Sequence, residues 1–418
     1  MNKIERLIQE LCPKGVKLVT LGKISTISSN GVDKKSKPNQ ISVRLLNYMD
    51  VYKVDQISKA HLSMNVTATP AQVRNCSILA GDLFFTPSSE TVDDIGHAAV
   101  AIEDIPDGVY SYHLHRLRFI NLNEINPNFI RHMFRTSFMQ KQIRKNASGM
   151  TRFGLTKGKW EALVVPLPPL VVQNKIVSIL DRFNQLESEL EAELEARKRQ
   201  FNYFVDELTS AGTASRFGGL TRPLGDLGEF VRGTGLQKSD LSEEGAPALH
   251  YGQIFTYYKT KIHSAKSMVS PQLAASIRHA QRGDVIVATT SENIADVCKS
   301  VVWLGEGDLA VGGETYIFKH ELDPLYATYL FRSSDFQYQK LSYISGTKVK
   351  RVSGKALEKM TVSVPNREAQ FRIGSFLSQL EDLLGDVNEG LPAEIEARRK
   401  QYEYYRNTLL TFKELDAA

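Results

Sequence analysis

Polar and basic side chains gather in a few short stretches between apolar runs. The stretch Ser148–Arg152 contains serine, glycine, threonine and arginine, and a similar stretch, Ser345–Arg351, returns later in the chain. Arginine and lysine suit guanine and phosphate groups, asparagine and glutamine suit adenine, and hydroxyl groups suit phosphates. Such side chains suit contacts with nucleic acid without requiring them, and the two serine–glycine loops offer the best candidates.

Candidate contact residues fall in both halves of the chain. Those of the first half are Asn30, Lys34, Lys35, Lys37, Ser88, Ser89, Tyr112, His113, His115, Arg116, Ser148, Thr151 and Arg152. Those of the second half are Lys238, Thr289, Thr290, Ser291, Glu314, Thr315, Thr347, Lys348, Lys350 and Arg351. An ordinary solvated loop explains Lys34–Lys37 equally well. A turn cap explains Glu90 and Glu292 at least as well as a contact to cytosine.

Familiar catalytic and metal-binding patterns are missing from the sequence. The segment Asn126–Phe129 lacks the second proline of an amino-methyltransferase motif and fits a helix N-cap better. The glycines at 154 and 158 have the wrong spacing for a phosphate loop. His113 and His115 are expected on one face of a strand, without partner ligands for a metal. We therefore expect no catalysis, no metal and no cofactor in this chain.

Length and composition set broad limits. A chain of 418 residues can form two or three domains, and its net charge of +5 permits nucleic acid as a partner without requiring it. The three cysteines, Cys12, Cys76 and Cys298, stand far apart and are expected to be reduced thiols. No apolar run reaches membrane-spanning length, and the N-terminal residues mix charges into apolar positions. We expect a cytoplasmic protein that does not bind membranes.

The second half of the chain repeats the first. Phe134–Ser137 corresponds to Phe331–Ser334, and Leu46–Tyr48 corresponds to Leu249–Tyr251. The closest match pairs AELEARKRQFNYF at 192–204 with AEIEARRKQYEYY at 393–405. Single matches of two or three residues arise by chance, but an ordered series with small changes of offset indicates an internal duplication.

Each half ends in a long helix with an apolar seam. Apolar residues alternate in steps of three and four, which is the pattern of a helix lying against another helix. The seam residues are Ile176, Leu180, Phe183, Leu190, Leu194, Phe201 and Phe204 in the first helix, and Ile373, Leu377, Leu380, Leu384, Ile395, Tyr402 and Tyr405 in the second. We predict that the two helices pair with each other.

The second helix is four residues longer than the first. Four added residues keep a heptad seam on one side, but Gly390 and Pro392 lie at the insertion and predict a kink or a break there. Arg197 and Arg398 fill the same seam position. Their stems can pack while their charged ends reach solvent, or they can form buried pairs with Glu193 and Glu394.

The predicted fold class is α+β. Two repeated globular domains are each followed by a long helix, and the two helices pair as an antiparallel coiled coil. The expected boundaries are 1–169 for the first domain, 170–211 for the central helix, 212–365 for the second domain and 366–418 for the C-terminal helix. Within the first domain, a single helix is expected from Pro127 through Ile143.

One family shares this architecture and two of these sequence stretches. The run VVPLPPLVVQNKIVSIL at 164–180, the weaker SVPNREAQFRIGSFL at 363–377 and the loop from Ser148 to Thr151 are similar to those of the specificity subunit of type I restriction–modification systems. The resemblance covers essentially the whole chain. The second run departs from the family pattern, because 366–369 replace the usual Pro-Leu-x-x, while Gln370 and Ile373 remain.

The resemblance implies a non-catalytic subunit that reads a split target in double-stranded DNA, with one target-recognition domain for each half. It implies docking of two methyltransferase subunits and of restriction subunits. It also implies that S-adenosylmethionine, ATP and Mg²⁺ bind only to those partners. A helix of about 39 residues spans roughly 58 Å and would act as a spacer that sets the unread gap.

A second interpretation is a coiled-coil scaffold whose repeated domains bind proteins. The two interpretations differ in their salt dependence. DNA binding that weakens steeply with salt would favour the specificity subunit, and binding insensitive to salt would favour the scaffold.

Overall fold

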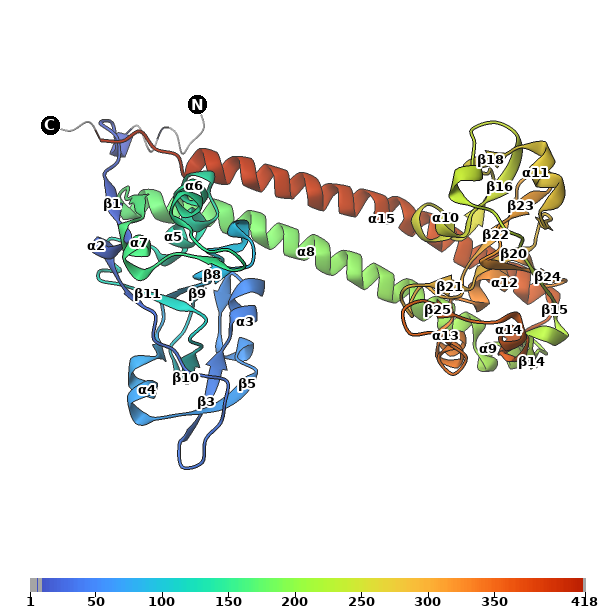
Figure 1. Ribbon diagram of the computed structural model, residues 1–418, viewed down its shortest axis with the longest axis horizontal. Helices are drawn as coiled ribbons and strands as arrows, with labels where there is room; N and C mark the ends of the chain where they lie inside the picture. Colours follow the sequence, from blue (N-terminus) through green and yellow to red (C-terminus); the bar gives the residue numbers. More distant parts are fainter. Residues whose placement is uncertain (1–5, 7–9, 416–418) are drawn as a thin grey trace. The chain divides into compact units, whose positions relative to one another are not determined.

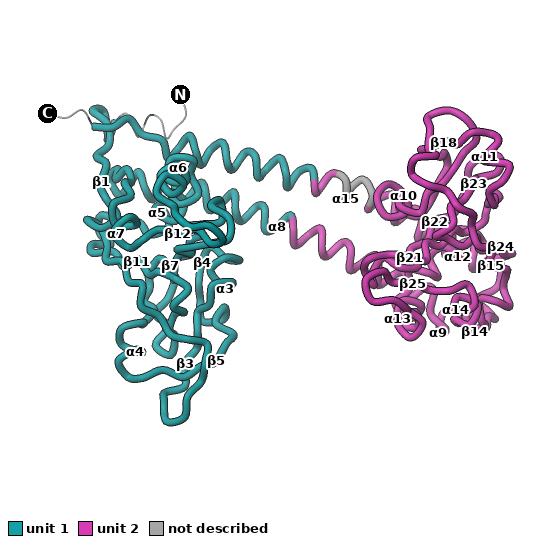
Figure 2. The backbone as a smooth tube through the Cα atoms, viewed as in Figure 1, with its two compact units in different colours: residues 1–190, 393–418 teal, residues 191–392 magenta. Residues whose placement is uncertain are grey.

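The computed structural model describes residue 6 and residues 10–415, except for the side chains of 385–389. The chain divides into two compact units (Figure 2). The first unit consists of residues 1–190 and 393–418, and the second consists of residues 191–392. Most of the N-terminal segment used in the prediction of compartment lies outside the described residues. None of the helices within the described part is long and apolar enough to cross a membrane.

The first unit contains two main sheets (Figure 1). The five-stranded sheet has the order β2-β11-β7-β9-β4, and the four-stranded sheet has the order β5-β3-β10-β6. Their strands are β2 (Ser25–Ser28), β3 (Ile41–Leu46), β4 (Gln56–Ile57), β5 (Met64–Ala68), β6 (Ser77–Ile78), β7 (Leu83–Phe85), β9 (Ala98–Ala101), β10 (Ile105–Tyr110) and β11 (His115–Phe119). Two short antiparallel pairs join distant segments, namely β1 (Leu18–Thr20) with β13 (Val164–Pro166) and β8 (Ser88–Ser89) with β12 (Phe153–Gly154).

Short helices surround these sheets. They are α2 (Leu21–Ile24), α3 (Tyr48–Lys53), α4 (Pro70–Asn75), α5 (Pro127–Phe134), α6 (Ser137–Asn146) and α7 (Lys157–Ala162), with 3₁₀ turns η1 (Lys59–His61) and η2 (Val92–Asp94). Asn126 caps α5 as expected, because its side chain accepts a hydrogen bond from the amide of Asn128 at 2.9 Å. The prediction of one helix through Ile143 is wrong. Thr136 accepts from the amide of Met139 at 3.2 Å and so caps a second helix, α6.

The second unit repeats this plan. Its five-stranded sheet has the order β15-β24-β20-β22-β17 and its four-stranded sheet the order β18-β16-β23-β19. The strands are β14 (Leu220–Pro223), β15 (Gly228–Arg232), β16 (Ala246–Leu249), β17 (Lys261–Ile262), β18 (Ser267–Val269), β19 (His279–Ala280), β20 (Val285–Ala288), β21 (Thr290–Ser291), β22 (Lys299–Trp303), β23 (Leu309–Val311), β24 (Thr315–His320), β25 (Lys350–Arg351) and β26 (Thr361–Val364). The helices are α9 (Ala211–Arg216), α10 (Tyr251–Thr256), α11 (Pro271–Ser276), α12 (Pro324–Leu330), α13 (Ser334–Leu341) and α14 (Gly354–Lys359), with η3 (Leu224–Asp226) and η4 (Lys238–Asp240). The matching strand orders confirm the internal duplication.

The two long helices, α8 (Leu170–Thr209) and α15 (Arg367–Leu409), each contribute one part to each unit. In the first unit, the Phe183 ring stacks 5.4 Å from Tyr405, and Glu187 binds Arg399 at 2.6 Å. Partner numbers on α15 fall as those on α8 rise, so the helices run antiparallel. In the second unit, Phe204 packs 5.8 Å from Phe376. The α+β fold with an antiparallel helix pair is confirmed.

Most of the predicted seam packs against a core. The seam residues that are buried are Ile176, Leu180, Phe201, Ile373, Leu377, Leu384, Ile395 and Tyr402. Those that are partly buried against a core are Phe183, Phe204, Leu380 and Tyr405. Leu190 and Leu194 are only half-buried. The seam pattern therefore predicts packing best where a globular domain also covers the helices.

Two details of the helices differ from expectation. Helix α15 continues through Pro392, so of the two predicted outcomes the break is wrong, and the kink stays a prediction. Proline costs about 3 kcal/mol inside a helix, and burial of Ile395 in the next turn helps to offset that cost. Arg197 and Arg398 each pair with the glutamate four residues earlier at 2.7 Å, but both pairs are exposed rather than buried.

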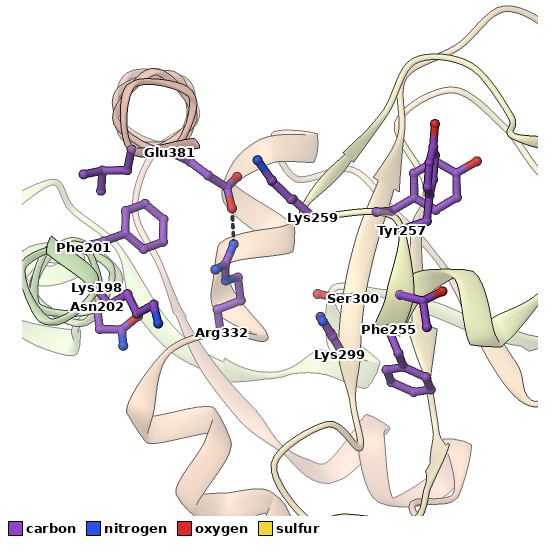
Figure 3. Close-up of a pocket in the computed structure, with 13 residues that line it drawn as sticks. Lys198, Phe201, Asn202, Phe255, Tyr257, Lys259, Lys299, Ser300, Arg332 and Glu381 are labelled. Atoms are coloured by element: carbon purple, nitrogen blue, oxygen red, sulfur yellow. Dashed lines mark hydrogen bonds and ion pairs between the residues drawn. The ribbon is translucent and has the colours of Figure 1, made fainter. Parts of the chain in front are cut away.

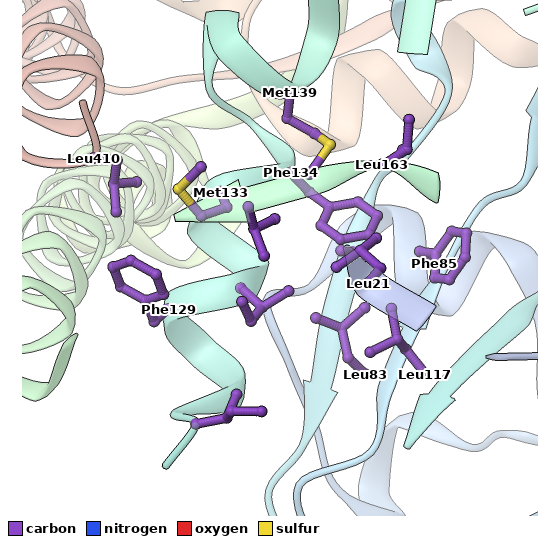
Figure 4. Packing of buried hydrophobic residues seen from close by; sticks show 14 of the residues in the cluster. Leu21, Leu83, Phe85, Leu117, Phe129, Met133, Phe134, Met139, Leu163 and Leu410 are labelled. Atoms are coloured by element: carbon purple, nitrogen blue, oxygen red, sulfur yellow. The ribbon is translucent and has the colours of Figure 1, made fainter. Parts of the chain in front are cut away.

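The core of the first unit joins residues from both ends of the chain. Figure 4 shows Leu410, which directly follows α15, beside Phe129 and Met133 of α5. Phe412 adds a ring contact to Phe129 at 6.4 Å. The segment after α15 also forms a backbone bridge between Val16 and Glu414. Residues 393–415 are therefore part of this unit's packing rather than a loose tail.

Candidate nucleic-acid interface

The two serine–glycine loops lie beside the predicted serine and threonine residues in both units. In the first unit, β12 pairs with β8, and Arg152 donates to the hydroxyl of Ser88 at 3.0 Å. In the second unit, β25 pairs with β21, so that Thr290 lies opposite Arg351 and Ser291 lies opposite Lys350. The structure thus brings together residues that are about 60 positions apart in the sequence. Ser148, Thr151 and Thr347 are exposed at the loops.

A turn and a basic loop complete this surface in the first unit. His113 lies in a turn before β11, with its ring 3.9 Å from that of Tyr112. Burial, then the charges of Arg152 and Lys34, lower the pKa of His113, so the ring is neutral at pH 7. Val32 forms a bridge with Ser111, which fixes the loop that carries the exposed residues Asn30, Lys34, Lys35 and Lys37. We call the β8–β12 strand pair with its 148–152 loop, the Tyr112–His113 turn and the 30–37 loop together the first reading surface.

Close backbone approach holds that basic loop in place. A Cβ atom added at Gly31 would lie 2.2 Å from the amide nitrogen of Tyr112. Only glycine allows the loop to come this near to the Tyr112–His113 turn.

Two predicted contact residues of the first unit are turned inward. Arg116 is 8% exposed and donates to the carbonyl of Ser77 at 2.8 Å. His115 packs its ring 5.5 Å from Phe85. The expectation that His113 and His115 share one strand face is wrong, because the strand begins only at His115. Neither His115 nor Arg116 belongs to the first reading surface.

In the second unit, Glu314 takes the place of His113. Thr290 donates its hydroxyl to Glu314 Oε2 at 2.5 Å, and the Thr289 amide donates to the Glu314 carbonyl at 3.1 Å. Lys348 and Arg351 are exposed on the neighbouring hairpin. Lys350 donates to the carbonyl of Thr347 at 2.8 Å and so holds the loop. Thr290, Glu314, Lys348, Lys350 and Arg351 form the second reading surface.

Three other predicted residues of the second unit do not reach this surface. Thr289 is 5% exposed and Thr315 is fully buried, so neither is available to a duplex in this conformation. Lys238 is exposed in η4, and its charge acts with burial to lower the pKa of His250, at the start of α10. Lys238 therefore lies beside α10 rather than on the hairpin.

A buried polar network joins the globular part of the first unit to the long helices. Arg131 is 1% exposed and binds Asp181 at 2.6 Å and Asp55 at 2.5 Å. His132 lies 2.8 Å from Asp181 and 3.0 Å from the hydroxyl of Tyr402. Burial is the main cause that lowers the pKa of His132 to about 4. Burial also raises the pKa of Asp55, but the charges of Arg135 and Arg131 outweigh it and hold this pKa below its usual value.

The corresponding region of the second unit contains a cavity of about 620 Å³ (Figure 3). Arg332 pairs with Glu381, which also accepts from Thr260 at 2.6 Å and from Tyr329 at 2.9 Å. Figure 3 shows Lys198 and Lys299 at the edge of the same cavity. The sequence reasoning missed both regions. The matched arginines Arg135 and Arg332 in the repeat are the signal that could have located them.

No group of side chains in the described part of the chain has the composition of a metal site. The chemistry that the two reading surfaces offer is therefore hydrogen bonding and charge: hydroxyls, a neutral imidazole, a carboxylate, and arginine and lysine side chains.

Comparison with known proteins places this arrangement in context. Residues 13–196 and 221–397 each match the type I restriction modification DNA specificity domain. A putative type I restriction enzyme specificity subunit of Haemophilus influenzae is 26% identical over 273 residues, which cover 63% of this chain and 68% of the relative. The specificity subunit of the Escherichia coli enzymes EcoR124I/EcoR124II is 28% identical over 249 residues, which cover 59% of this chain and 61% of the relative.

A solved structure also has the same fold. It comes from work on complex assembly and conformational transition of the type I R-M system, and it aligns with a TM-score of 0.60 at 15% identity. The alignment covers 95% of this chain and 98% of the solved chain.

Proposed function

This chain belongs to the type I restriction modification DNA specificity family, and we propose on that basis that it selects the DNA target of a type I restriction–modification enzyme. It reads a split duplex target, and each recognition domain contacts one half. The observation that supports this proposal is the repeat of one surface, built on a short strand pair, with different polar side chains: Ser88 and His113 in one copy and Thr290 and Glu314 in the other.

We also propose how the parts of the chain divide the work. Residues 1–169 and 212–365 contact the two half-sites, and residues 170–211 and 366–418 form the spacer. The chain performs no catalysis itself. It acts in the cytoplasm with two methyltransferase subunits and with restriction subunits, and S-adenosylmethionine, ATP and Mg²⁺ bind to those partners.

The phosphate contacts within this proposal come from exposed basic residues. Lys34, Lys35, Lys37 and Arg152 serve the first half-site, and Lys348 and Arg351 serve the second. Such contacts position a protein on DNA without reading its sequence, so each adds to affinity and to its salt dependence.

The test is to map methylated bases in host DNA with and without this chain. A split motif with two unlike halves should be present with the chain and vanish on its deletion. An unchanged methylation pattern would contradict the proposal and favour a protein-binding scaffold.

Helix length provides a second test. We propose that the long helices set the number of unread base pairs between the half-sites. Deletion of residues 389–392 removes about one helical turn from α15. The mapped motif should then keep both halves and change its gap, and a variant that assembles with an unchanged gap would argue against the spacer role.

A further inference from the structure

His113 and Glu314 occupy the same place in the two repeats. His115 lies opposite Phe85 of β7 in the first unit, and Tyr316 lies opposite Val287 of β20 in the second. The strand orders show that β7 and β20 correspond, as do β11 and β24. Two residues before these positions stand His113 in one copy and Glu314 in the other, each in the turn that precedes its strand. The charge of Arg152, beside β12, acts on His113, and Thr290 of β21 donates to Glu314, so each residue lies near the short strand pair of its reading surface.

Hydrogen bonds orient the Glu314 carboxylate, but within the described residues no ion pair offsets its charge. Thr290 donates to Oε2, and the backbone of Glu314 is held through Thr289. Arg351 lies opposite Thr290 in the β21–β25 strand pair, yet Glu314 forms no ion pair with any lysine or arginine among residues 10–415. A carboxylate with a purely structural role would gain from pairing with the nearby cations. Instead, Oε1 stays available as a hydrogen-bond acceptor at a half-buried surface position.

The chemistry of DNA limits what such an acceptor can meet. Phosphate oxygens repel a carboxylate, so Glu314 gains nothing from the backbone of a duplex. In the major groove, cytosine presents only the N4 amino donor, whereas adenine places the N7 acceptor beside its amino group. Cytosine is therefore the base that suits a carboxylate best.

We propose that Glu314 reads the N4 amino group of one cytosine in the half-site bound by the second recognition domain, and that His113 contacts a different base group at the corresponding place in the first. Thr290 is the positioning residue that aims the carboxylate. This inference rests on the proposed function. It adds the two residues, His113 and Glu314, that make the two recognition domains prefer different half-sites.

The two side chains offer different hydrogen-bonding patterns. A carboxylate only accepts, whereas a neutral imidazole has one donor and one acceptor nitrogen. His113 is also backed by the ring of Tyr112, which fixes its plane. Because His113 and Glu314 occupy corresponding positions in the two repeats, their different hydrogen-bonding patterns give the two surfaces different base preferences.

The experiment uses the complete modification complex in host cells, with the full chain carrying E314Q or E314A. Methylated motifs are mapped for each variant. One position of one half-site should change from cytosine to a mixture of bases, with preference for cytosine reduced about 5- to 100-fold, the range expected for one base contact. The other half-site should be unchanged. His113→Ala should give the reverse pattern, in which only the first half-site changes.

Glu306→Gln is the matched control, because it removes the same charge from the same unit. Glu306 is exposed and comes shortly after Val302 of β22, which pairs with Val285 at the start of β20. Thr290 comes shortly after Ala288, at the end of β20. Glu306 and Thr290 therefore lie near opposite ends of this strand. This variant should keep the wild-type motif. If E314A fails to assemble, E314Q still tests the contact, since the amide keeps an acceptor for the Thr290 hydroxyl.

The outcomes separate this inference from the proposed function. A motif that depends on the chain but is identical in wild type, E314Q and E314A would overturn the role of Glu314 and leave the proposed function intact. A change in both half-sites would show that Glu314 acts through folding or assembly and would also overturn it. Methylation that does not depend on the chain at all would contradict the proposed function itself.

Discussion

The two units connect their recognition domains to the long helices through the same backbone positions but with different chemistry. In the first unit, Asp55, Arg131 and Asp181 form a charged cluster that is largely buried. In the second, the corresponding positions carry Thr260, Thr328 and Ser378, and the charged contacts include the Arg332–Glu381 pair and a Lys261–Asp382 pair at 2.7 Å. The amides of Val100 and Val302 donate to the carbonyls of Asp55 and Thr260, respectively, which confirms that these two positions correspond.

This difference shows that the buried charges are not a requirement of the fold. The second unit folds the same sheets and the same helix contacts with hydroxyl groups and a cavity in place of the cluster. Buried ion pairs often contribute little net stability, because desolvation offsets their attraction, yet removal of one partner is costly. We call the contacts between each recognition domain and the long helices its junction. Single substitutions in the junction of the first unit should therefore lower its stability, whereas the junction of the second unit should tolerate them.

The largest effect is expected from Asp55→Asn. Asp55 binds both Arg131 and Arg135 and accepts from Asn184 at 2.6 Å, so its loss leaves buried positive charge poorly matched. We expect the free energy of unfolding of the first unit to fall by about 3 kcal/mol. Hydrogen exchange followed by mass spectrometry reports each unit separately. Thr260→Val in the second unit is the counterpart and should cost about 1 kcal/mol. Equal losses would show that the two junctions do not differ in this way.

The next effect is a selective sensitivity to acid. His132 has a pKa of about 4 in the folded state and about 6.5 when unfolded. Between these values the unfolded chain binds more protons, so the first unit should lose up to about 3 kcal/mol as pH falls from 6.5 to 4. Tyr329 corresponds to His132 in the second unit. Burial raises the pKa of Tyr329 above the usual value of tyrosine, so this residue does not titrate between pH 4 and 6.5.

Hydrogen exchange across this pH range tests the prediction. His132→Asn should remove most of the acid sensitivity of the first unit. If that variant loses stability with acid as steeply as wild type, another group is responsible.

A smaller effect is expected from Tyr402→Phe. The hydroxyl lies 3.0 Å from His132 Nδ1 and connects α15 to the recognition domain. Its loss should cost about 1 kcal/mol and increase exchange of backbone amides near residue 402. The second unit already has phenylalanine at the corresponding position, Phe201, beneath the guanidinium of Arg332 at 5.1 Å. Phe201→Tyr should therefore not stabilise its unit, and a gain comparable to the loss in Tyr402→Phe would contradict the comparison.

The smallest effect is expected at the matched arginines of the two helices. Arg197→Ala and Arg398→Ala each break an exposed pair with a glutamate four residues earlier, which should cost less than about 0.5 kcal/mol. Urea unfolding of both variants provides the measurement. If both variants lose a similarly small free energy of unfolding, the two units differ in the contacts between domain and helices and not in the helices themselves.

Sequence reasoning correctly predicted those features of the molecule that depend on local sequence pattern. The heptad seam identified Ile176, Leu180 and Phe201 as packing residues, because side chains three and four apart share a helix face. It also placed Leu190 and Leu194 in the helix-pair seam, where they are only half-buried, because a seam pattern alone does not show what covers each turn of a helix. The repeat identified the corresponding hairpins because both copies keep serine and glycine at the same places.

The junction network lay beyond such reasoning. Arg131 and Asp181 are 50 residues apart and Asp55 and Arg135 are 80 apart, so their pairing depends on the docking of a helix against a sheet. Arg116 failed as a predicted contact for a related reason. Its position on a strand did not show that the side chain would bend back to the carbonyl of Ser77. The sequence offered Glu314 and Thr315 alike as contact residues. In the structure β24 begins at Thr315, which is buried in the core, and Glu314 precedes the strand at the surface.

The closing of the first unit by the C-terminal segment has a consequence for synthesis on the ribosome. Residues 191–392 form an uninterrupted stretch, so the second unit has all its parts once residue 392 has emerged. The first unit lacks Tyr402, Leu409 and Leu410 until the last helix is made. At about 5–20 residues per second, roughly 10–40 s separate translation of residue 190 from that of residue 410. During that interval the apolar surface around Phe129 and Ile176 has no partner from α15, so the half of the protein that is translated first is completed last.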